Sequence, residues 1–331
     1  MLQIDRSSER LSHANILEVQ EVLSTATKEA ATAVGPFIGK GETVKNLADQ
    51  AAVDAIAKVL SKNDVFGCRV VIGEGEKDKA PMFEHGSFIG SNHSNVYDMA
   101  IDPLEGTSLA VEAKEGAISI VALSDSGTMV EWLGVNYMKK KFVGPRAAKE
   151  LSIVGDVRLD GNPEENLKLV AKSLGKKISD LTVAVLFRER NRDIFEAAHK
   201  VGANIMGLYH GDVIPAIMTC YEDSGIDMVY SSGGSPEGVI ATAAVEILGG
   251  GSQLMWDPQS ANPHEKDILR EREILGRVLY PSNIVGDGNL FVSFTAVTPY
   301  RPASSESGTA SGPIGWDSGY SFSKFRQKHT G

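Results

Sequence analysis

Cysteine is scarce in this chain, since only Cys68 and Cys220 occur among its 331 residues. The two lie far apart in the sequence and lack the close spacing of a metal-binding pair. Isolated cysteines of this kind usually behave as small apolar side chains in the core. The sequence therefore predicts two reduced, buried thiols and a reducing compartment, which we take to be the cytoplasm.

Long apolar runs and an excess of positive charge are also absent. No stretch approaches the roughly 18 apolar residues of a membrane span, and the N-terminal segment lacks the apolar core of a secretory signal. The chain has 33 Lys and Arg against 43 Asp and Glu, a formal net charge of -10. That balance argues against a general nucleic-acid or membrane surface, although a local basic cluster can still hold an anionic ligand. We expect a soluble protein with no nucleic-acid and no membrane partner.

What the chain does contain is ordinary globular composition, with 42% hydrophobic and 23% charged residues. Its length suits one large domain or two, and it has no internal repeat. Strands alternate with helices after residue 150, whereas the first half mixes helices with an antiparallel meander. We therefore expect an α/β fold with an N-terminal half over 1–150, a C-terminal half over 151–300 and a tail over 301–331.

The hydrophobic pattern places the individual elements. Apolar stripes at helical spacing predict helices over 12–34, 46–62, 162–175, 193–201, 213–221 and 263–276, and an Ala-rich helix that ends near 248. Runs of β-branched and aromatic residues predict strands over 68–72, 96–101, 117–123, 128–133, 137–143, 181–187, 204–209, 226–232 and 290–297. Within 137–143, the run Lys139–Lys141 is interpreted as a solvated sheet edge.

The last segment is rich in Ser, Gly and Pro from Pro302 onward. Such composition predicts a loosely ordered tail. The alternative is that Trp316, Tyr320 and Phe322 pin the tail to the body of the protein.

The stretch Asp102-Pro-Leu-Glu-Gly-Thr107 is the centre of the functional argument. Pro103 favours an extended backbone at Asp102, so the preceding strand delivers this carboxylate to its C-terminal end. Gly106 permits a tight turn or a close backbone approach. From Thr107 the sequence is helical in character up to about residue 115.

Two carboxylates and a hydroxyl thus lie within one short strand-to-helix turn. The free N–H groups of a helix N-terminus favour an anion such as phosphate. Carboxylate oxygens favour hard cations such as Mg²⁺ or Mn²⁺. Metal and phosphate in one place indicate phosphoryl transfer to water. Taken alone, the stretch also fits a plain acidic turn, so the rest of the chain has to decide.

Further carboxylates lie at the end of a predicted strand or at the start of a predicted helix. Glu74 stands between two glycines after the strand 68–72, and Glu237 follows the strand 226–232 at another glycine-rich junction. Asp49 lies in the first turn of its helix, where an acidic residue is usually a partner of the helix dipole. In open α/β sheets, ligands collect at the carboxyl ends of strands. We therefore expect the acidic residues at strand ends to share one site.

Two basic residues, Arg188 and Arg190, also follow a predicted strand end. Arginine suits phosphate because its planar guanidinium donates to two oxygens at once. The mouth of the sheet is thus predicted to hold two cations and two phosphates.

These residues resemble those of a known group of enzymes. The turn Asp102–Thr107, with Gly73-Glu-Gly-Glu76 upstream, resembles the metal-dependent, lithium-sensitive sugar and inositol phosphatases. The closer match is to the class II fructose-1,6-bisphosphatases of bacteria, and it extends from the first helix to about residue 250. The motifs that carry it are 46–49, 73–76, 80–82, 102–107, 137–140, 174–176, 211–213 and 235–238.

The resemblance implies a role for each matching residue. It implies metal ligands or their direct neighbours at Asp49, Glu74, Asp102, Glu105 and Glu237. It implies that Thr107 orients and helps to deprotonate the attacking water, assisted by Asp49 or Glu74. It implies substrate contacts from Glu105, Gly106, Thr107, Tyr137, Arg188, Arg190, His210, Asp212 and Gly234. It further implies alternating helix and sheet layers, Mg²⁺ or Mn²⁺ as cofactor, and a homo-oligomer, either a dimer or a tetramer.

The activity implied is hydrolysis of the 1-phosphate of fructose 1,6-bisphosphate to fructose 6-phosphate. One alternative is a dual enzyme that also takes sedoheptulose 1,7-bisphosphate, and the sequence does not separate the two. Another is an inositol-phosphate or nucleotide 3′-phosphatase, against which Tyr137, Arg188 and Arg190 argue. A third is a catalytically silent binding protein, against which the intact set of carboxylates and Thr107 argues.

The chain departs from the family pattern at three places. His210 stands where the family commonly has Asp, and Arg188 where it commonly has Lys. The approach to Asp49, Thr43-Val-Lys-Asn46, also differs from the usual Gly-Asp/Glu-Lys-Asn. A histidine at 210 predicts an altered pH dependence or sugar preference, or simply a cap for the helix that follows.

Overall fold

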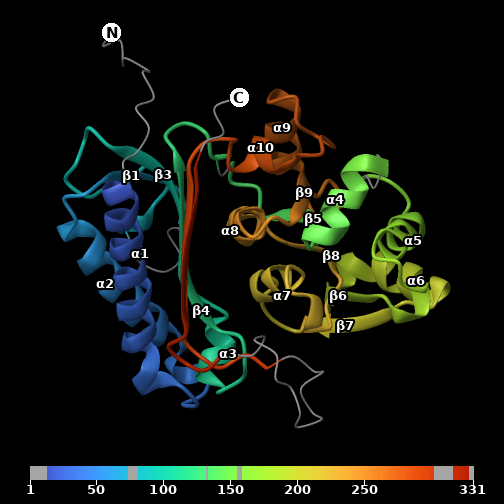
Figure 1. Ribbon diagram of the computed structural model, residues 1–331, viewed down its shortest axis with the longest axis horizontal. Coiled ribbons are helices and arrows are strands. Elements are labelled where there is room, and N and C mark those ends of the chain that lie inside the picture. The colour runs from blue at the N-terminus through green and yellow to red at the C-terminus, as the bar shows by residue number, and fades with distance from the viewer. Residues whose placement is uncertain (1–12, 74–80, 132, 155–158, 302–315, 328–331) are drawn as a thin grey trace.

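The computed structural model describes residues 13–73, 81–131, 133–154, 159–301 and 316–327. Helices and sheets alternate in five layers, which Figure 1 shows nearly edge-on. From one side to the other these are α1 and α2, a first sheet, α7 and α8, a second sheet, and α4 to α6. This confirms the expected α/β fold with alternating layers.

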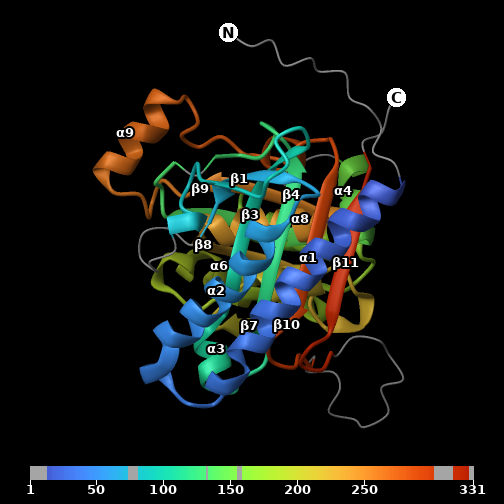
Figure 2. The same ribbon diagram turned by 90° about the vertical axis from the view of Figure 1, so that its left-hand side faces the viewer.

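The first sheet has six strands in the order β11-β10-β4-β3-β1-β2. Its elements are β1 Gly67–Ile72, β2 Phe88–Ile89, β3 Val96–Glu105, β4 Ile118–Asp125, β10 Leu290–Ala296 and β11 Ser321–Arg326. Only the β1–β3 pair is parallel among these described strands. The helices α1 (His13–Val34) and α2 (Lys45–Lys62) cover one face, and Figure 2 shows α1 crossing the strands obliquely. Val19, Leu23 and Ile56 are fully buried between these helices and the sheet.

The second sheet has five strands in the order β7-β6-β8-β5-β9. They are β5 Tyr137–Val143, β6 Thr182–Leu186, β7 Asn204–Leu208, β8 Met228–Gly234 and β9 Gly251–Trp256. Its outer face packs against α4 Pro145–Val154, α5 Pro163–Ser173 and α6 Arg192–Val201. The peripheral helices are α3 Thr107–Val111, α9 Pro263–Glu271 and α10 Pro281–Ile284.

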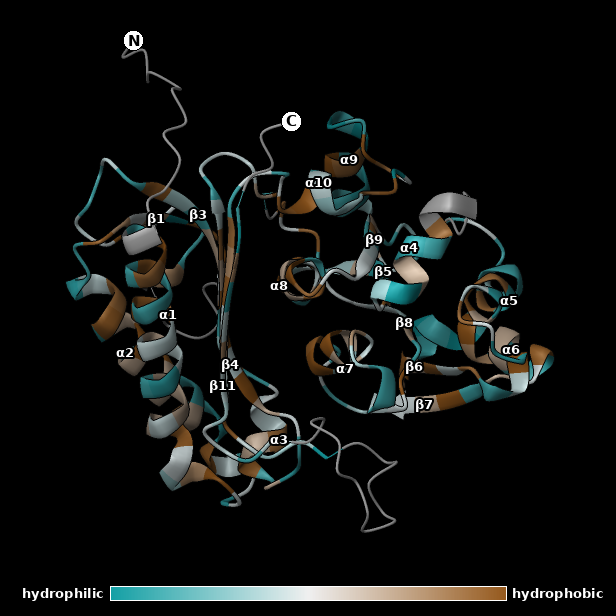
Figure 3. Ribbon diagram, viewed as in Figure 1, coloured by the Kyte–Doolittle hydropathy of each residue, from teal (hydrophilic) through white to brown (hydrophobic). Residues whose placement is uncertain are grey.

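The middle layer consists of α7 (Val213–Met218) and α8 (Ser235–Ile247). All six residues of α7 are buried, and ten residues of α8 are buried. Figure 3 shows both helices mostly in the brown of hydrophobic residues. A helix that is apolar all round has to be covered on every side, and here the two sheets supply that cover.

The sheets do not divide the chain at residue 150. β5 lies in the second sheet although it belongs to the predicted N-terminal half, and β10 returns to the first sheet. Each half of the chain therefore contributes a strand to a sheet built mainly from the other half. No helix of the described residues is long and apolar enough to cross a membrane.

The expectation of a solvated edge at Lys139–Lys141 is wrong. β5 is an inner strand between β8 and β9, and Lys140 and Lys141 are only 0% and 4% exposed. Successive side chains of a strand point to opposite faces. Lys139 Nζ accordingly lies 3.6 Å from Asp193 on one face, while Lys140 pairs with Asp212 on the other. Lys140 thus meets a carboxylate inside the protein, which a sequence pattern alone does not reveal.

The expectation of a loose tail is wrong for residues 316–326. β11 pairs antiparallel with β10 along its whole length. Trp316 stacks on Tyr320, with ring centroids 5.3 Å apart, and Phe322 stacks on Phe294 at 5.0 Å. The alternative that aromatic side chains pin this segment is thus confirmed. The remainder of the tail, 302–315 and 328–331, lies outside the described residues.

The strand predicted over 128–133 is also wrong, since 128–131 and 133 have no strand pairing. The backbone N–H groups of Thr128 and Met129 donate to Asp98 Oδ2, at 2.9 and 3.1 Å. The N–H of Val130 donates to the carbonyl of Ile284. These donors are therefore committed to a side chain and a loop rather than to a ladder of strand hydrogen bonds.

The cysteine prediction is confirmed in its main point. Both thiols are free, with Cys68 buried and Cys220 half-buried. Burial raises the pKa of each to about 12. At neutral pH both therefore stay protonated and unreactive.

Candidate active site

β3 carries Asp102 and Glu105, and it is longer than the predicted strand 96–101 because it continues through an irregularity. Its register against β4 shifts between Asp102 and Glu105. Pro103 has no N–H to donate, so proline in a strand is found at such irregularities. The N–H of Leu104 donates to Asp102 Oδ1, at 3.0 Å. The shift re-aims the side chains that follow it.

The turn after β3 depends on Gly106, whose φ of 81° lies in the left-handed region that glycine tolerates. The helix that follows, α3, ends at Val111 rather than near residue 115. Its last carbonyls, of Ala110 and Val111, accept hydrogen bonds from Gly39 and Gly41 of the α1–α2 connection. A distant segment thus caps the helix, and Thr107 stands at its first position.

Thr107 and Asp49 form a pair, although 58 positions separate them in the sequence. The Thr107 hydroxyl donates to Asp49 Oδ1, with an oxygen–oxygen distance of 2.8 Å. It also lies 3.1 Å from the Leu104 carbonyl. Asp49 is buried. Its hydrogen bond with Thr107 gives this carboxylate a specific partner in addition to the dipole of α2. With its hydrogen directed to Asp49, the hydroxyl oxygen has lone pairs left to accept a hydrogen bond from water.

Glu105 lies at the centre of a group of carboxylates. Its own burial raises its pKa well above the usual range. The neighbouring charges of Asp102 and Glu237, and then of Asp212, raise it further. Negative charges brought this close together repel one another unless a cation offsets them.

Two carboxylate oxygens of this group have no hydrogen-bond partner within the described part of the chain: Glu105 Oε1 and Glu237 Oε2, both buried. Glycines allow the carboxylates to come close to the backbone. A Cβ at Gly211 would lie 2.9 Å from Glu105 Oε1, and one at Gly234 would lie 2.0 Å from Glu237 Oε2. Glu105, Gly211, Gly234 and Glu237 therefore come together from both sheets.

Asp212, at the turn before α7, is 2% exposed and binds Lys140. Lys140 Nζ lies 2.9 Å from Oδ1 and 2.7 Å from Oδ2 of this carboxylate. Sequence reasoning missed Lys140. The signal was present, because Lys140 alternates with the buried Met138 and Phe142 on one face of β5.

Tyr137, Arg190 and Gly234 form the next part of the site. Tyr137 is paired with Gly234 across β5 and β8. The Arg190 guanidinium lies over the Tyr137 ring, 4.1 Å from its centroid, and its Nε donates to the Ser232 carbonyl at 2.9 Å. A cation over an aromatic face is held electrostatically, so the orientation of Arg190 is fixed by the sheet.

Arg188 and His210 lie at the exposed rim. The Arg188 guanidinium donates to the carbonyls of Phe187 and Tyr209, each at 2.9 Å. It is thus anchored beside His210. Arg188 and Arg190 have different partners, since Arg188 contacts the carbonyl of Tyr209 after β7 and Arg190 contacts Tyr137 of β5 and Ser232 of β8.

The described residues include no group of three or more His, Cys, Asp or Glu side chains in a metal-binding arrangement. Glu74, the remaining predicted ligand, lies in 74–80, outside the described residues. The residues present nevertheless fit a cation. Buried carboxylate oxygens without a partner are costly, and carboxylate oxygens are the ligands that hard divalent cations take. Glu105 Oε1 and Glu237 Oε2 are such oxygens.

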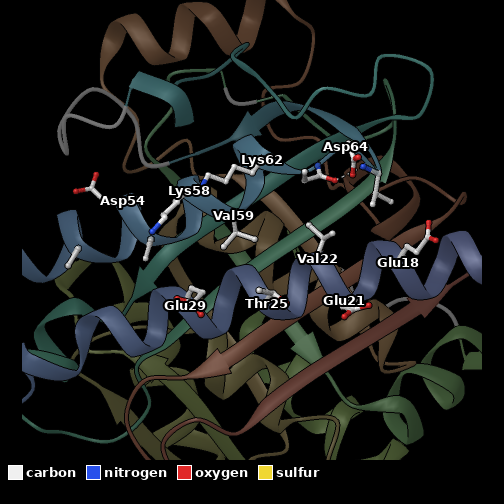
Figure 4. Close-up of a pocket in the computed structure, with 14 residues that line it drawn as sticks. Glu18, Glu21, Val22, Thr25, Glu29, Asp54, Lys58, Val59, Lys62 and Asp64 are labelled. Carbon is white, nitrogen blue, oxygen red and sulfur yellow. Dashed lines mark hydrogen bonds between the residues drawn. The ribbon is translucent and has the colours of Figure 1, made fainter.

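A separate groove of about 880 Å³ lies between α1 and α2, and Figure 4 shows it. Val22 and Val59 lie between acidic side chains such as Glu21 and the lysines Lys58 and Lys62. None of the residues that line this groove is a predicted site residue. Its size therefore does not make it the active site.

The family model described as "Bacterial fructose-1,6-bisphosphatase, glpX-encoded" matches residues 18–301. A Haemophilus influenzae protein named "Fructose-1,6-bisphosphatase class 2" is 33% identical over 287 residues, which cover 83% of each chain. An Escherichia coli K12 protein named "Fructose-1,6-bisphosphatase 1 class 2" is also 33% identical over 287 residues, covering 83% of this chain and 82% of that protein.

The matched range spans the predicted site from Asp49 to Glu237, and the resemblance to this family is confirmed. The chain belongs to the class 2 fructose-1,6-bisphosphatases, a family of phosphoric monoester hydrolases.

Proposed function

We propose that this chain hydrolyses the 1-phosphate of fructose 1,6-bisphosphate, giving fructose 6-phosphate and inorganic phosphate. The observation that carries the proposal is the Thr107–Asp49 hydrogen bond beside the buried carboxylate oxygens Glu105 Oε1 and Glu237 Oε2. A hydroxyl paired with a carboxylate can position water, and carboxylate oxygens can hold cations against a phosphate. Family membership then supplies the sugar bisphosphate as substrate.

The family is metal-dependent, and we propose Mg²⁺ or Mn²⁺ for this chain because the donor set consists of carboxylates. The residues that would hold the ions are Asp49, Glu74, Asp102, Glu105 and Glu237. Bound cations would supply positive charge that polarises the phosphoryl group, acidifies water and stabilises the leaving oxygen.

The protein's own residues would prepare the water and the sugar. Thr107 accepts a hydrogen bond from the attacking water, and its own proton is directed to Asp49. Contacts to the substrate would come from the 105–107 backbone, Tyr137, Arg188, Arg190, His210, Asp212 and Gly234. Binding energy from the distant phosphate would then place the reacting phosphate next to the water.

The test of the function is a phosphate-release panel with Mg²⁺ or Mn²⁺. Its substrates are fructose 1,6-bisphosphate, sedoheptulose 1,7-bisphosphate, inositol monophosphate and adenosine 3′,5′-bisphosphate. We expect the highest kcat/KM with fructose 1,6-bisphosphate. Faster turnover of inositol monophosphate or of the nucleotide would refute the proposal, and no turnover of any of the four would indicate a silent binding protein.

Arg190→Ala tests whether Arg190 binds the phosphate of the substrate that does not react. We expect kcat/KM for fructose 1,6-bisphosphate to fall by a factor that corresponds to about 1.5–3 kcal/mol of lost transition-state stabilisation, the scale of a hydrogen bond to a charged group. The substitution removes the guanidinium that the Tyr137 ring and the Ser232 carbonyl hold in place. p-Nitrophenyl phosphate has a single phosphate and no sugar, so its hydrolysis should hardly change.

The matched control for this prediction is Arg192→Ala. Arg192 is exposed and pairs with Glu189 at 2.6 Å, three positions away. Exposed pairs of this kind contribute little, so both substrates should be hydrolysed as by the wild type. Equal losses on both substrates in Arg190→Ala would instead move Arg190 to the reacting phosphate or to a structural role.

We also propose a homo-oligomer, a dimer or a tetramer, in the cytoplasm. The family resemblance supports the oligomer, and the two free thiols agree with a reducing compartment. Light scattering coupled to size-exclusion chromatography would determine the mass of the assembly.

A further inference from the structure

The strand β5 sends one lysine into the interior between the sheets. Lys140 is fully buried, and it is among the largest side chains of the protein with essentially no exposure. Its neighbours Lys139 and Lys141 point to the opposite face of the strand. A lysine is almost never fully buried unless it is paired. The position of this one therefore needs an explanation.

Two glycines leave room for the Lys140 side chain. A Cβ at Gly238 of α8 would lie 3.2 Å from Lys140 Cδ, and a Cβ at Gly233 would lie 2.9 Å from Lys140 Cε. The same Cβ at Gly233 would lie 2.9 Å from Asp212 Oδ2. The aliphatic stem thus passes beside Gly238 and Gly233, and the amine reaches Asp212.

The amine holds both oxygens of one carboxylate. Lys140 Nζ donates to Asp212 Oδ1 at 2.9 Å and lies 2.7 Å from Oδ2, while the Ser231 hydroxyl lies 3.5 Å from Oδ2. Asp212 is 2% exposed, so the surrounding solvent screens this pair only weakly. Each carboxylate oxygen has a second lone-pair site, which leaves Asp212 able to accept a further hydrogen bond.

The pair lies at the edge of the carboxylate group. Gly211, directly before Asp212, approaches Glu105 Oε1 so closely that a Cβ there would be 2.9 Å away. The negative charges of Asp102, Glu237 and Asp212 in turn raise the pKa of Glu105. The ion pair Lys140–Asp212 places a cation beside this group of carboxylates.

We propose that Lys140 is a positioning residue for the sugar: it holds the Asp212 carboxylate in one orientation at the edge of the site, where Asp212 accepts a hydrogen bond from a sugar hydroxyl. The proposal rests on the proposed function, in which Asp212 contacts the substrate. Without the lysine, the Asp212 carboxylate would lose the donor that contacts both of its oxygens. Lys140 itself touches neither the sugar nor the reacting phosphate.

The competing explanation is a purely structural ion pair. A buried pair replaced by neutral side chains of similar shape is often as stable as the original, whereas removing one partner is strongly destabilising. The two explanations therefore differ most clearly in the neutral double variant Lys140→Met with Asp212→Asn. Methionine keeps an unbranched stem, and asparagine keeps the shape of aspartate.

The experiment is a double-mutant cycle on the full chain with its activating metal ion. It compares the wild type, Lys140→Met, Asp212→Asn and the double variant in kcat, KM and thermal midpoint. For each variant we expect kcat/KM for fructose 1,6-bisphosphate to fall roughly 10- to 150-fold, the range of a hydrogen bond to a charged group. Most of that fall should be in KM, and p-nitrophenyl phosphate should be hydrolysed within about threefold of the wild type.

The cycle should be strongly non-additive, because Lys140 acts only through Asp212. Lys140→Met should therefore lower kcat/KM no further in the Asp212→Asn background. If Lys140→Met does not fold, the comparison of Asp212→Asn with the double variant can still refute the proposal, because a further loss of kcat/KM in the double variant would contradict it. Lys139→Met, on the opposite face of β5, is the matched control and should leave both substrates unaffected.

Three results would overturn the proposal. A double variant with wild-type kcat/KM would make the pair structural only. A further loss from Lys140→Met in the Asp212→Asn background would mean that the lysine acts by its own contact. Equal losses with fructose 1,6-bisphosphate and p-nitrophenyl phosphate would exclude a role toward the sugar.

A failure of the proposed function would look different. In that case the wild type itself would prefer another compound of the substrate panel. The same cycle, run with that preferred compound, would still test whether Lys140 acts through Asp212.

Discussion

Asp102→Asn is expected to lower kcat for fructose 1,6-bisphosphate by roughly 10³-fold or more, since the loss of a metal-binding charge removes several kcal/mol of transition-state stabilisation. The fold should persist. Asp102 Oδ1 accepts a hydrogen bond from the Leu104 N–H at 3.0 Å, and an asparagine oxygen can accept the same bond. Steady-state kinetics over a series of Mg²⁺ or Mn²⁺ concentrations, together with a thermal midpoint, would check both parts.

Asp98→Asn is the matched control, because Asp98 lies on the same strand. It is fully buried, and its Oδ2 accepts hydrogen bonds from Thr128 N–H and Met129 N–H. It also pairs with Arg69 at 3.2 Å. Here we expect the opposite pattern: a loss of about 1–3 kcal/mol in the free energy of unfolding, with near-normal turnover per folded molecule. An Asp102→Asn variant that is merely unstable, with normal kcat, would contradict its role at the metal site.

Metal removal should reproduce the effect of Asp102→Asn in the wild type. The oxygens Glu105 Oε1 and Glu237 Oε2 are buried without a hydrogen-bond partner in the described residues. They sit among carboxylates that raise the pKa of Glu105. We expect activity to vanish in EDTA and to return with Mg²⁺ or Mn²⁺. Full turnover by a metal-stripped sample would exclude this mechanism.

The sequence was sufficient for features that depend on local patterns. The apolar stripe of α1 buries Val19 and Leu23 as its spacing predicted. The β-branched and aromatic residues of β1 and β3 placed both strands, and Gly106 has the positive φ that its turn requires. The local rules hold here because α1 packs its apolar stripe on the sheet and both strands are buried along nearly their whole length.

Features that depend on distant partners were not predictable from local patterns. Lys140 reads as a surface residue until Asp212, 72 positions later, is known to meet it. The aromatic residues of the tail read as part of a Ser- and Gly-rich segment until Phe322 is seen on Phe294. α3 is shorter than expected, since the backbone leaves the helix where Ala113 has a φ of 53°. The N–H groups of Gly39 and Gly41, which bond to its last carbonyls, belong to another part of the chain.

The site itself shows the same division. Each carboxylate could be recognised from its place at the end of a strand or helix. Which carboxylates lie close together depends on how the sheets and helices stack in layers. β3 brings Glu105 from the first sheet, and β8 with α8 brings Glu237 from the second. The pairing of Asp49 with Thr107 requires α2 to lie against α3, and no spacing along the chain encodes that contact.

That contact determines the second large effect, which we expect from Thr107→Ala. The Thr107 hydroxyl donates to Asp49 Oδ1 at 2.8 Å, so its oxygen can accept a hydrogen bond from water on the other side. Alanine removes the hydroxyl and leaves the helix, since α3 has no side-chain cap to lose. We expect kcat to fall by roughly 10²-fold or more, the scale of positioned proton transfer, with a much smaller change in KM. Steady-state kinetics with fructose 1,6-bisphosphate would measure both.

The controls for Thr107→Ala follow from the same geometry. Thr107→Ser keeps the hydroxyl and should retain most of the activity, whereas Thr107→Val keeps the shape without the hydroxyl and should behave as alanine does. Asp49→Asn leaves the hydroxyl but offers it a weaker, uncharged acceptor, so kcat should fall there too. A Thr107→Ala enzyme with normal kcat and raised KM would assign the hydroxyl to ground-state binding of the phosphate instead of to the water. Since Asp49, which accepts the hydrogen bond of Thr107, is also proposed to hold a metal ion, we expect water activation and metal binding to be coupled through Asp49.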